Sequence, residues 1–137
     1  MKKLILTALL FCFAGATYSQ YGEKIRMEKL LATDTTSVGQ KIIYPNFTNP
    51  EISYYRITLP KGCSTGWHQH SFPVFAYIEQ GTLTVEFENK GVKTFSKGDA
   101  FAEVIDLPHN GYNSGNEDVV LLAIFMGEKG KSLSTHK

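Results

Sequence analysis

The chain has 137 residues, of which 14 are basic and 13 acidic, and its formal net charge at pH 7 is +1. This near balance gives no electrostatic footprint for nucleic acid or for an anionic membrane, so both are excluded as partners and a small molecule is expected instead. The length allows one domain with its own hydrophobic core, and two domains would not fit.

Residues 1–19 are expected to be a signal peptide. Lys2 and Lys3 precede an apolar run that starts at Leu4, and small residues precede a cut that fits best after Ser19. The apolar run is shorter than the roughly 20 residues that a stable transmembrane helix needs, so a retained anchor is the weaker interpretation. We therefore expect a periplasmic or secreted protein with no membrane association once the signal peptide has been removed.

The remaining sequence predicts an all-β domain, because no window shows sustained helical periodicity and short alternating runs recur throughout. Residues 20–50 carry no recognisable motif and are expected to add one or two edge strands. The main domain is expected at residues 51–130. It opens with a strand in which Tyr55, Ile57 and Leu59 share one face.

Two later strands are also predicted from their patterns of apolar residues. In residues 82–89, Leu83, Val85 and Phe87 are predicted to face inward, with the threonines and glutamates between them facing water. Residues 119–126 are apolar on both faces and predict an interior strand. Residues 131–137 are expected to be a tail. Many short antiparallel strands without a disulfide favour a sandwich or a small barrel, whose closure protects the sheet edges.

Two histidines stand one residue apart at His68 and His70. On a strand they point to the same side, with their imidazoles near enough to share one metal ion. A third, His109, follows the strand predicted at residues 99–104, and an antiparallel neighbour could bring it alongside the pair. Three imidazoles with an open position are a recognised metal arrangement, although each histidine alone could be an ordinary core or surface residue.

The spacing around these histidines resembles the two motifs of the cupin superfamily. The first motif is matched at Gly62, His68, His70, Val74 and Gly81. The second is matched at Gly98, Val104, Asp106, His109 and Asn113. Val74 replaces the glutamate that is usual in the first motif. In the second, Val104 and Asp106 replace the usual proline and glycine.

The resemblance implies an antiparallel cupin-type jelly-roll barrel that holds a divalent transition metal through His68, His70 and His109. Valine cannot coordinate a metal, so three interpretations stay open. The site has three histidines, as in some oxygenases of the family, or another acid fills in, or the metal has been lost. The metal could be Fe, Zn, Mn, Ni or Cu, since imidazole suits several. A homodimer is also compatible with the resemblance, because dimers are common in the family.

Three neutral imidazoles would leave the charge of a divalent ion uncompensated, so the site should attract an anion. Glu103 shares a face with Phe101 by strand alternation. If that alternation holds, Glu103 faces inward and serves as a base or a fourth ligand; if the strand bulges, it lies in water. Tyr77 and Tyr112 are candidate catalytic donors to a bound substrate.

The leading functional prediction is an exported, metal-dependent, oxygenase-like enzyme that acts on a small anionic or chelating substrate. The alternative is a non-catalytic protein of the same fold that binds a metal or a small ligand. A third interpretation is a metal-free barrel in which the histidines merely pack.

Overall fold

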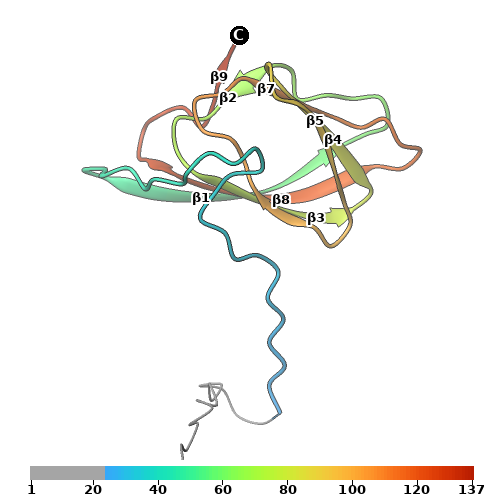
Figure 1. Cartoon of the computed structure of the whole chain (residues 1–137), viewed down its shortest axis with the longest axis horizontal. Helices are drawn as coiled ribbons and strands as arrows, with labels where there is room; N and C mark the ends of the chain where they lie inside the picture. The colour runs from blue at the N-terminus through green and yellow to red at the C-terminus, as the bar shows by residue number, and fades with distance from the viewer. Residues whose placement is uncertain (1–23) are drawn as a thin grey trace, which may run out of the picture.

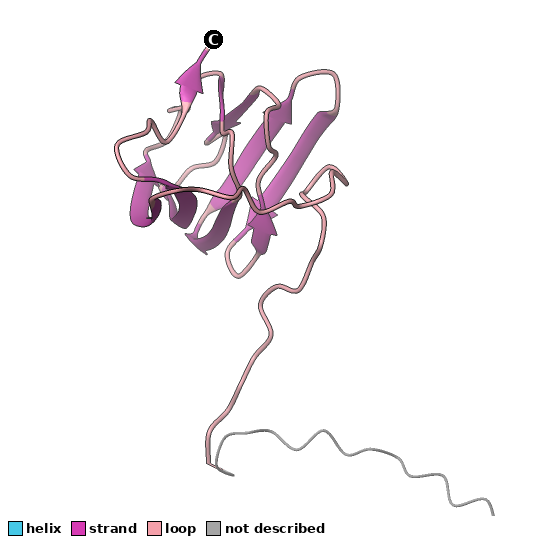
Figure 2. Ribbon diagram, turned by 90° about the vertical axis from the view of Figure 1, so that its left-hand side faces the viewer, coloured by secondary structure: helices cyan, strands magenta, loops and turns pink. Residues whose placement is uncertain are grey.

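The structure is a computed structural model that describes residues 24–137. The predicted signal peptide lies outside the described residues. Within residues 24–137 the chain forms nine β-strands and no helix, which confirms the all-β prediction (Figure 2). This part of the chain therefore contains no helix long and apolar enough to span a membrane.

The strands pair only in the antiparallel sense and form two sheets. Their bounds are β1 (Pro50–Leu59), β2 (His68–Gln69), β3 (Val74–Gln80), β4 (Thr82–Phe87), β5 (Gly91–Ser96), β6 (Ala100–Ala102), β7 (His109–Tyr112), β8 (Val119–Glu128) and β9 (Thr135–His136). One sheet has the order β1-β8-β3-β6 and the other β5-β4-β7-β2-β9. Figure 1 shows β1, β8 and β3 below β2, β7, β4 and β5. The arrangement is that of a jelly roll, although the hydrogen-bonded ladders of the described strands do not close into one continuous barrel.

The apolar strand predicted at residues 119–126 makes up the first eight of the ten residues of β8. It lies between β1 and β3 and pairs with both along most of its length. One face of β8 is buried between the sheets, and the other is half-buried on the outside of the molecule. Neighbours on both edges confirm β8 as an interior strand of its sheet, although only one of its two apolar faces is fully buried.

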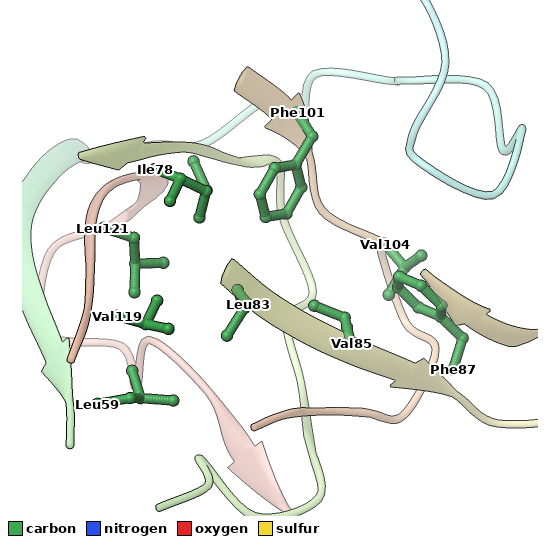
Figure 3. Close-up of a cluster of buried hydrophobic side chains, with 10 residues drawn as sticks. Leu59, Ile78, Leu83, Val85, Phe87, Phe101, Val104, Val119 and Leu121 are labelled. Carbon is green, nitrogen blue, oxygen red and sulfur yellow. The ribbon is translucent and has the colours of Figure 1, made fainter. Parts of the chain in front are cut away.

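The core lies between the two sheets, and both contribute to it (Figure 3). Leu83, Val85 and Phe87 of β4 point inward and are buried, as the alternation predicted. Fully burying such a side chain contributes about 1.5–3 kcal/mol relative to leaving it exposed. Thr84 differs from the prediction because it is buried although it alternates with these residues; its neighbours across the sheet are Thr94 and Tyr112.

Two motif positions adopt a left-handed backbone. Gly81 joins β3 to β4 with φ of 74°, and a Cβ there would lie 2.7 Å from the carbonyl oxygen of Asp118, so only glycine fits. Asp106 stands where the family motif has glycine and also has a positive φ, 52°. Aspartate is one of the few residues that tolerate this region. The Asp106 N–H donates to the carbonyl of His70 at 2.8 Å, which holds the β6–β7 connection against the histidine segment.

The prediction of edge strands before residue 50 is wrong for the described part, residues 24–49. Residues 35–41 form a turn closed by one isolated bridge between Thr35 and Lys41, and no part of residues 24–49 forms a sheet strand. The turn is docked by the side chain of Gln40, which donates to the Ile105 carbonyl at 3.0 Å and accepts from the Ile105 N–H at 3.1 Å. The backbone contributes one more contact, because the Ser37 N–H donates to the Ala102 carbonyl of β6 at 2.8 Å. Residues 24–34 are exposed and run away from the sheets (Figure 1).

Candidate metal centre

The three motif histidines come together where β2 meets β7. His68 of β2 lies directly opposite His109 of β7 in the antiparallel register, so a neighbouring strand does bring the third histidine alongside the pair. His70 follows β2 and stays on the same side as His68, as the two-residue period of an extended chain requires. The ring centroid of His68 lies 4.4 Å from that of His109 and 5.0 Å from that of His70.

Glu103 completes this group from the other sheet, one residue after β6. Its Oε2 lies 3.1 Å from Nε2 of His70 and 3.3 Å from Nε2 of His109, and 15% of its side chain is exposed. One ligand atom from each of the four residues lies within 4.8 Å of the others. Ligands at about 2.0–2.2 Å from one ion can be at most about 4.4 Å apart, so the group is close to the size a single ion needs.

Glu103 is also adjacent to the position where the family motif carries its carboxylate. Its backbone N–H donates to the carbonyl of Val74 at 2.9 Å. Val74 itself is buried among the apolar side chains of Phe72, Ala123 and Phe125 and offers no ligand. The carboxylate at this end of the molecule therefore comes from the strand next to β3, and Glu103 faces inward rather than lying in water.

Backbone carbonyls fix the orientation of all three imidazoles. Each Nδ1 lies within hydrogen-bond distance of one carbonyl oxygen: Gly66 for His68 at 2.9 Å, Leu133 for His70 at 2.8 Å and Leu107 for His109 at 3.0 Å. A carbonyl can only accept, so each Nδ1 carries its hydrogen and donates it. When these rings are neutral, each Nε2 has a free lone pair that can bind an ion in the space between the three histidines and Glu103. Such outer contacts are the usual way in which metal-binding histidines are held.

The electrostatics of the group call for a cation. Burial would raise the pKa of Glu103, but the neighbouring His109 and His70 hold that pKa well below its usual range. Burial alone would lower the pKa of His70, and the hydrogen bond and charge of Glu103 raise it instead. Burial lowers the pKa of His68. An ionised Glu103 among imidazoles is stable only with a positive charge beside it, which is a proton on His70 or a metal ion.

His109 provides a direct test of whether a metal fits. Its side chain is buried, and its Nε2 makes no hydrogen bond of acceptable geometry, although Glu103 Oε2 is only 3.3 Å away. A buried nitrogen lone pair without a partner is unfavourable, and a metal ion would satisfy it. Three imidazole nitrogens and one carboxylate oxygen suit a divalent transition metal such as zinc, iron, manganese, nickel or copper. The described residues therefore fit such an ion.

The structure does not bring the two candidate tyrosines to this group. Tyr77 of β3 alternates with buried Ala76 and Ile78, so it lies on the outer face of its sheet. Tyr112 of β7 likewise lies on the face opposite to that of His109. Neither residue lines the cavity beside the histidines. The hypothesis that they donate to a bound substrate is therefore corrected: strand alternation turns both away.

Sequence reasoning missed the segment after β8. Residues 131–137 were expected to be a tail, but Thr135 and His136 form β9, which pairs with the free edge of β2 opposite Gln69 and His68. Lys137 forms an ion pair with Glu88. The same segment supplies the Leu133 carbonyl that holds His70. A strand of two residues shows no periodicity, so the sequence offered no signal for it.

A cavity of about 70 Å³ adjoins the four residues. The three histidines and Glu103 line part of its wall, and the rest is mainly apolar side chains from both sheets, including Leu83, Val85, Phe101 and Leu121. A wider space of about 290 Å³ shares His68 and His70 with this cavity and leads outward between β1 and the β9 segment. Tyr55, Ile57, Phe125, Leu133 and His136 are among the residues that line it.

Solved structures with a similar fold include two enzymes. DMSP lyase DddQ from Ruegeria pomeroyi is 17% identical with a TM-score of 0.55, and the match covers 63% of this chain and 43% of the lyase. Bacillus subtilis oxalate decarboxylase, which contains Mn(II) centres, is 20% identical with a TM-score of 0.53 and coverages of 62% and 23%. A cupin-like protein from Thermotoga maritima is 17% identical with a TM-score of 0.56 and coverages of 63% and 64%. The chain spans less than two thirds of each, and these likenesses show the fold alone.

The sequence also matches a family model. No curated protein matches the sequence of this chain significantly. The model described as "Cupin domain" matches residues 55–125, which is more than half of the chain and includes all three histidines and Glu103. The family match agrees with the two antiparallel sheets and with the motif spacing. The chain belongs to the cupin family.

Proposed function

We propose that the protein binds one divalent metal ion through His68, His70, Glu103 and His109 and is an oxygenase-like enzyme that acts on a small anionic or chelating substrate. The observation that carries this proposal is the convergence of four ligand atoms within 4.8 Å in a largely buried site. When bound, such an ion would polarise a coordinated substrate and, if redox active, could activate dioxygen.

The protein's own residues would have three tasks. The backbone carbonyls that accept from Nδ1 keep the Nε2 atoms aimed at the shared space. Glu103 offsets part of the metal charge inside a poorly solvated interior. The apolar walls exclude water from the site, and the wider space beside β1 gives a substrate access. Two of the similar solved structures are enzymes named for small-molecule substrates, which supports an enzymatic function.

A non-catalytic metal-binding or ligand-binding protein is the second candidate, and one observation favours it. Among the described residues that line the cavity, the only titratable side chains are the four of the proposed ligand set. A separate general acid or base is therefore missing from the cavity wall. Oxygen consumption by the metal-loaded protein, measured with diketones, thiols and catechol-like compounds, separates the two candidates, and a lack of turnover with all of them favours binding.

Metal content tests the site itself. We expect purified native protein to contain one equivalent of metal by elemental analysis. We expect His68→Ala, His70→Ala and His109→Ala each to lose it, because each removes one nitrogen ligand. His136→Ala is the matched control, since this exposed histidine lies beside His68 but outside the group. Cooperative thermal unfolding confirms that each variant is folded. Full metal content in all three variants would contradict the proposal.

We also propose that the protein is exported and forms a homodimer. Export is supported by the sequence of residues 1–19, and N-terminal sequencing of protein from its native host tests it. The dimer is supported by the outer face of the β1–β8–β3 sheet, where Ile52 and Tyr54 are 68% and 61% exposed beside the half-buried Leu122 and Ile124. Light scattering in solution tests the dimer.

A further inference from the structure

We infer that the site takes a substrate with a single negative charge at the metal-binding head and a short apolar body, and that it rejects dicarboxylates. This inference rests on the proposed metal binding and names the substrate class for that same site. It is carried by the charge of the ligand group, by the walls of the cavity and by its size.

The net charge of a metal ion with its four ligands favours a substrate with a single negative charge. The three imidazoles donate from Nδ1 to carbonyls, so with Nε2 on a metal they are neutral ligands. A divalent ion with three neutral histidines and ionised Glu103 has a net charge of about +1. One monoanionic head makes the site neutral. A dianion would leave an excess negative charge in an apolar interior, which is strongly unfavourable.

The cavity wall offers no cationic side chain that could pair with a second carboxylate of a substrate. In the part of the chain that the structure describes, no lysine or arginine lines the cavity or the wider space next to it. Thr65, the only hydroxyl residue on the cavity wall, already donates to the Gly66 carbonyl at 3.1 Å and accepts from the Gly111 N–H at 3.0 Å. A second carboxylate held inside the cavity would therefore lose its hydration and gain no hydrogen-bond donor, because the donors Tyr55, Ser134 and His136 line the wider space and not the cavity.

The size of the cavity limits the body of the substrate. A volume of about 70 Å³ corresponds to roughly five to seven water molecules, at about 10–15 Å³ for each. This space holds a body of only a few heavy atoms in contact with Leu83, Val85 and Leu121. A longer body would extend past Ile57 toward the wider space, which is lined by Tyr55 and Phe125. The apolar part of the substrate is therefore compact or narrow.

Two four-carbon acids test the inference. The protein is loaded with Co²⁺, the metal is counted by elemental analysis, and butyrate and succinate are titrated at pH 7 while the visible spectrum of the bound cobalt is followed. The acids differ in that a second carboxylate replaces a methyl group. We expect butyrate to bind at least tenfold more tightly than succinate. Equal or tighter binding of succinate, or a spectrum that responds to neither acid, would overturn the inference. Failure to bind cobalt would instead overturn the proposed function.

A pair of variants at Ile57 separates charge from size. Ile57 is half-buried and lines both the cavity and the wider space, but it is not one of the four proposed metal ligands. Ile57→Arg places a cation where the second carboxylate would lie, and we expect it to shift the preference at least tenfold toward succinate. Ile57→Met keeps the wall apolar and should retain the preference for butyrate. An Ile57→Arg variant that binds cobalt and still prefers butyrate to the same extent would contradict the role of charge.

Discussion

The carboxylate of the site shows how much depends on single residues. Glu103 and Val74 face each other on adjacent strands, joined by a backbone hydrogen bond of 2.9 Å, so a carboxylate on either strand reaches the same end of the molecule. The sequence predicted the histidine pair from the strand period and offered Glu103 from its alternation with Phe101. Tyr77 could not be placed in the same way, because β3 is apolar on both faces and its pattern does not show which face is the inner one.

The role of Glu103 can be tested by removing its charge. Glu103→Gln keeps the shape of the side chain but loses the anion beside His70 and His109. We expect the affinity for metal to fall about tenfold or more, as measured by competition with a chelator of known affinity. Glu86→Gln is the control, since this exposed glutamate of β4 lies outside the site. An unchanged affinity in Glu103→Gln would show that the carboxylate contributes nothing to metal binding.

A carboxylate placed on the neighbouring strand should rescue the metal affinity that is lost with Glu103. In a Glu103→Val background, Val74→Glu should restore much of the lost affinity, because it returns a carboxylate to the neighbouring strand. Val74 is buried, so the added atoms should cost about 1–3 kcal/mol in the free energy of unfolding. Denaturant unfolding measures that cost, and chelator competition measures the recovery of affinity.

At the scale of elements, β9 is the part of the site that sequence patterns could not predict. β8 was predictable because its long, continuous apolar run is typical of a strand with neighbours on both edges. β9 has two residues, and its contribution to the site is a backbone carbonyl, that of Leu133, which every residue type possesses. A contact made by a backbone carbonyl leaves no pattern in the sequence, because any residue type could make it. The edge strands expected before residue 50 are absent from residues 24–49, where the side chain of Gln40 and one backbone hydrogen bond, from Ser37 N–H to the Ala102 carbonyl, hold the segment in place.

Shortening this segment tests its contribution. We expect a chain that ends after Ser132 to bind metal about tenfold or more weakly, because His70 loses the Leu133 carbonyl that orients it. A chain that ends after Ser134 keeps that carbonyl and should bind nearly as well as the whole chain. Leu133→Ala removes the packing of this side chain but keeps the carbonyl, so it separates the two effects. NMR of the imidazole nitrogens reports whether the His70 hydrogen remains on Nδ1; weak binding with an unchanged tautomer would contradict the explanation.

At the scale of the whole molecule, the ligand group spans the two sheets. His68 and His109 belong to the sheet that contains β2 and β7, whereas Glu103 extends the ladder between β6 and β3. The hydrogen-bonded ladders of the described strands do not join the sheets, which are held together by the packing of the core. A metal ion would therefore add a cross-link between two layers that are otherwise joined by core packing, by chain connections and by loop contacts such as the hydrogen bond from Asp106 N–H to the His70 carbonyl.

This position predicts a large effect of metal on stability. A ligand that binds only the folded state at a concentration 100 times its Kd adds about 2.7 kcal/mol to the free energy of unfolding. For a domain of this size the melting temperature should rise by on the order of 10 °C. Differential scanning calorimetry with metal and with a chelator measures the shift. His109→Ala should show no metal-dependent shift, and a shift of the wild-type size in that variant would place the metal elsewhere.

The displacement of the carboxylate from β3 to the adjacent β6 ladder has a consequence for how cupin sequences are compared. A linear signature that requires glutamate four residues after the histidine pair would classify this chain as lacking an acidic ligand. In a pleated sheet, however, positions far apart along the chain have their side chains close together on one face when they face each other across one ladder. A gap in a linear signature should therefore be checked against the facing positions of the neighbouring strand before a ligand is judged to have been lost.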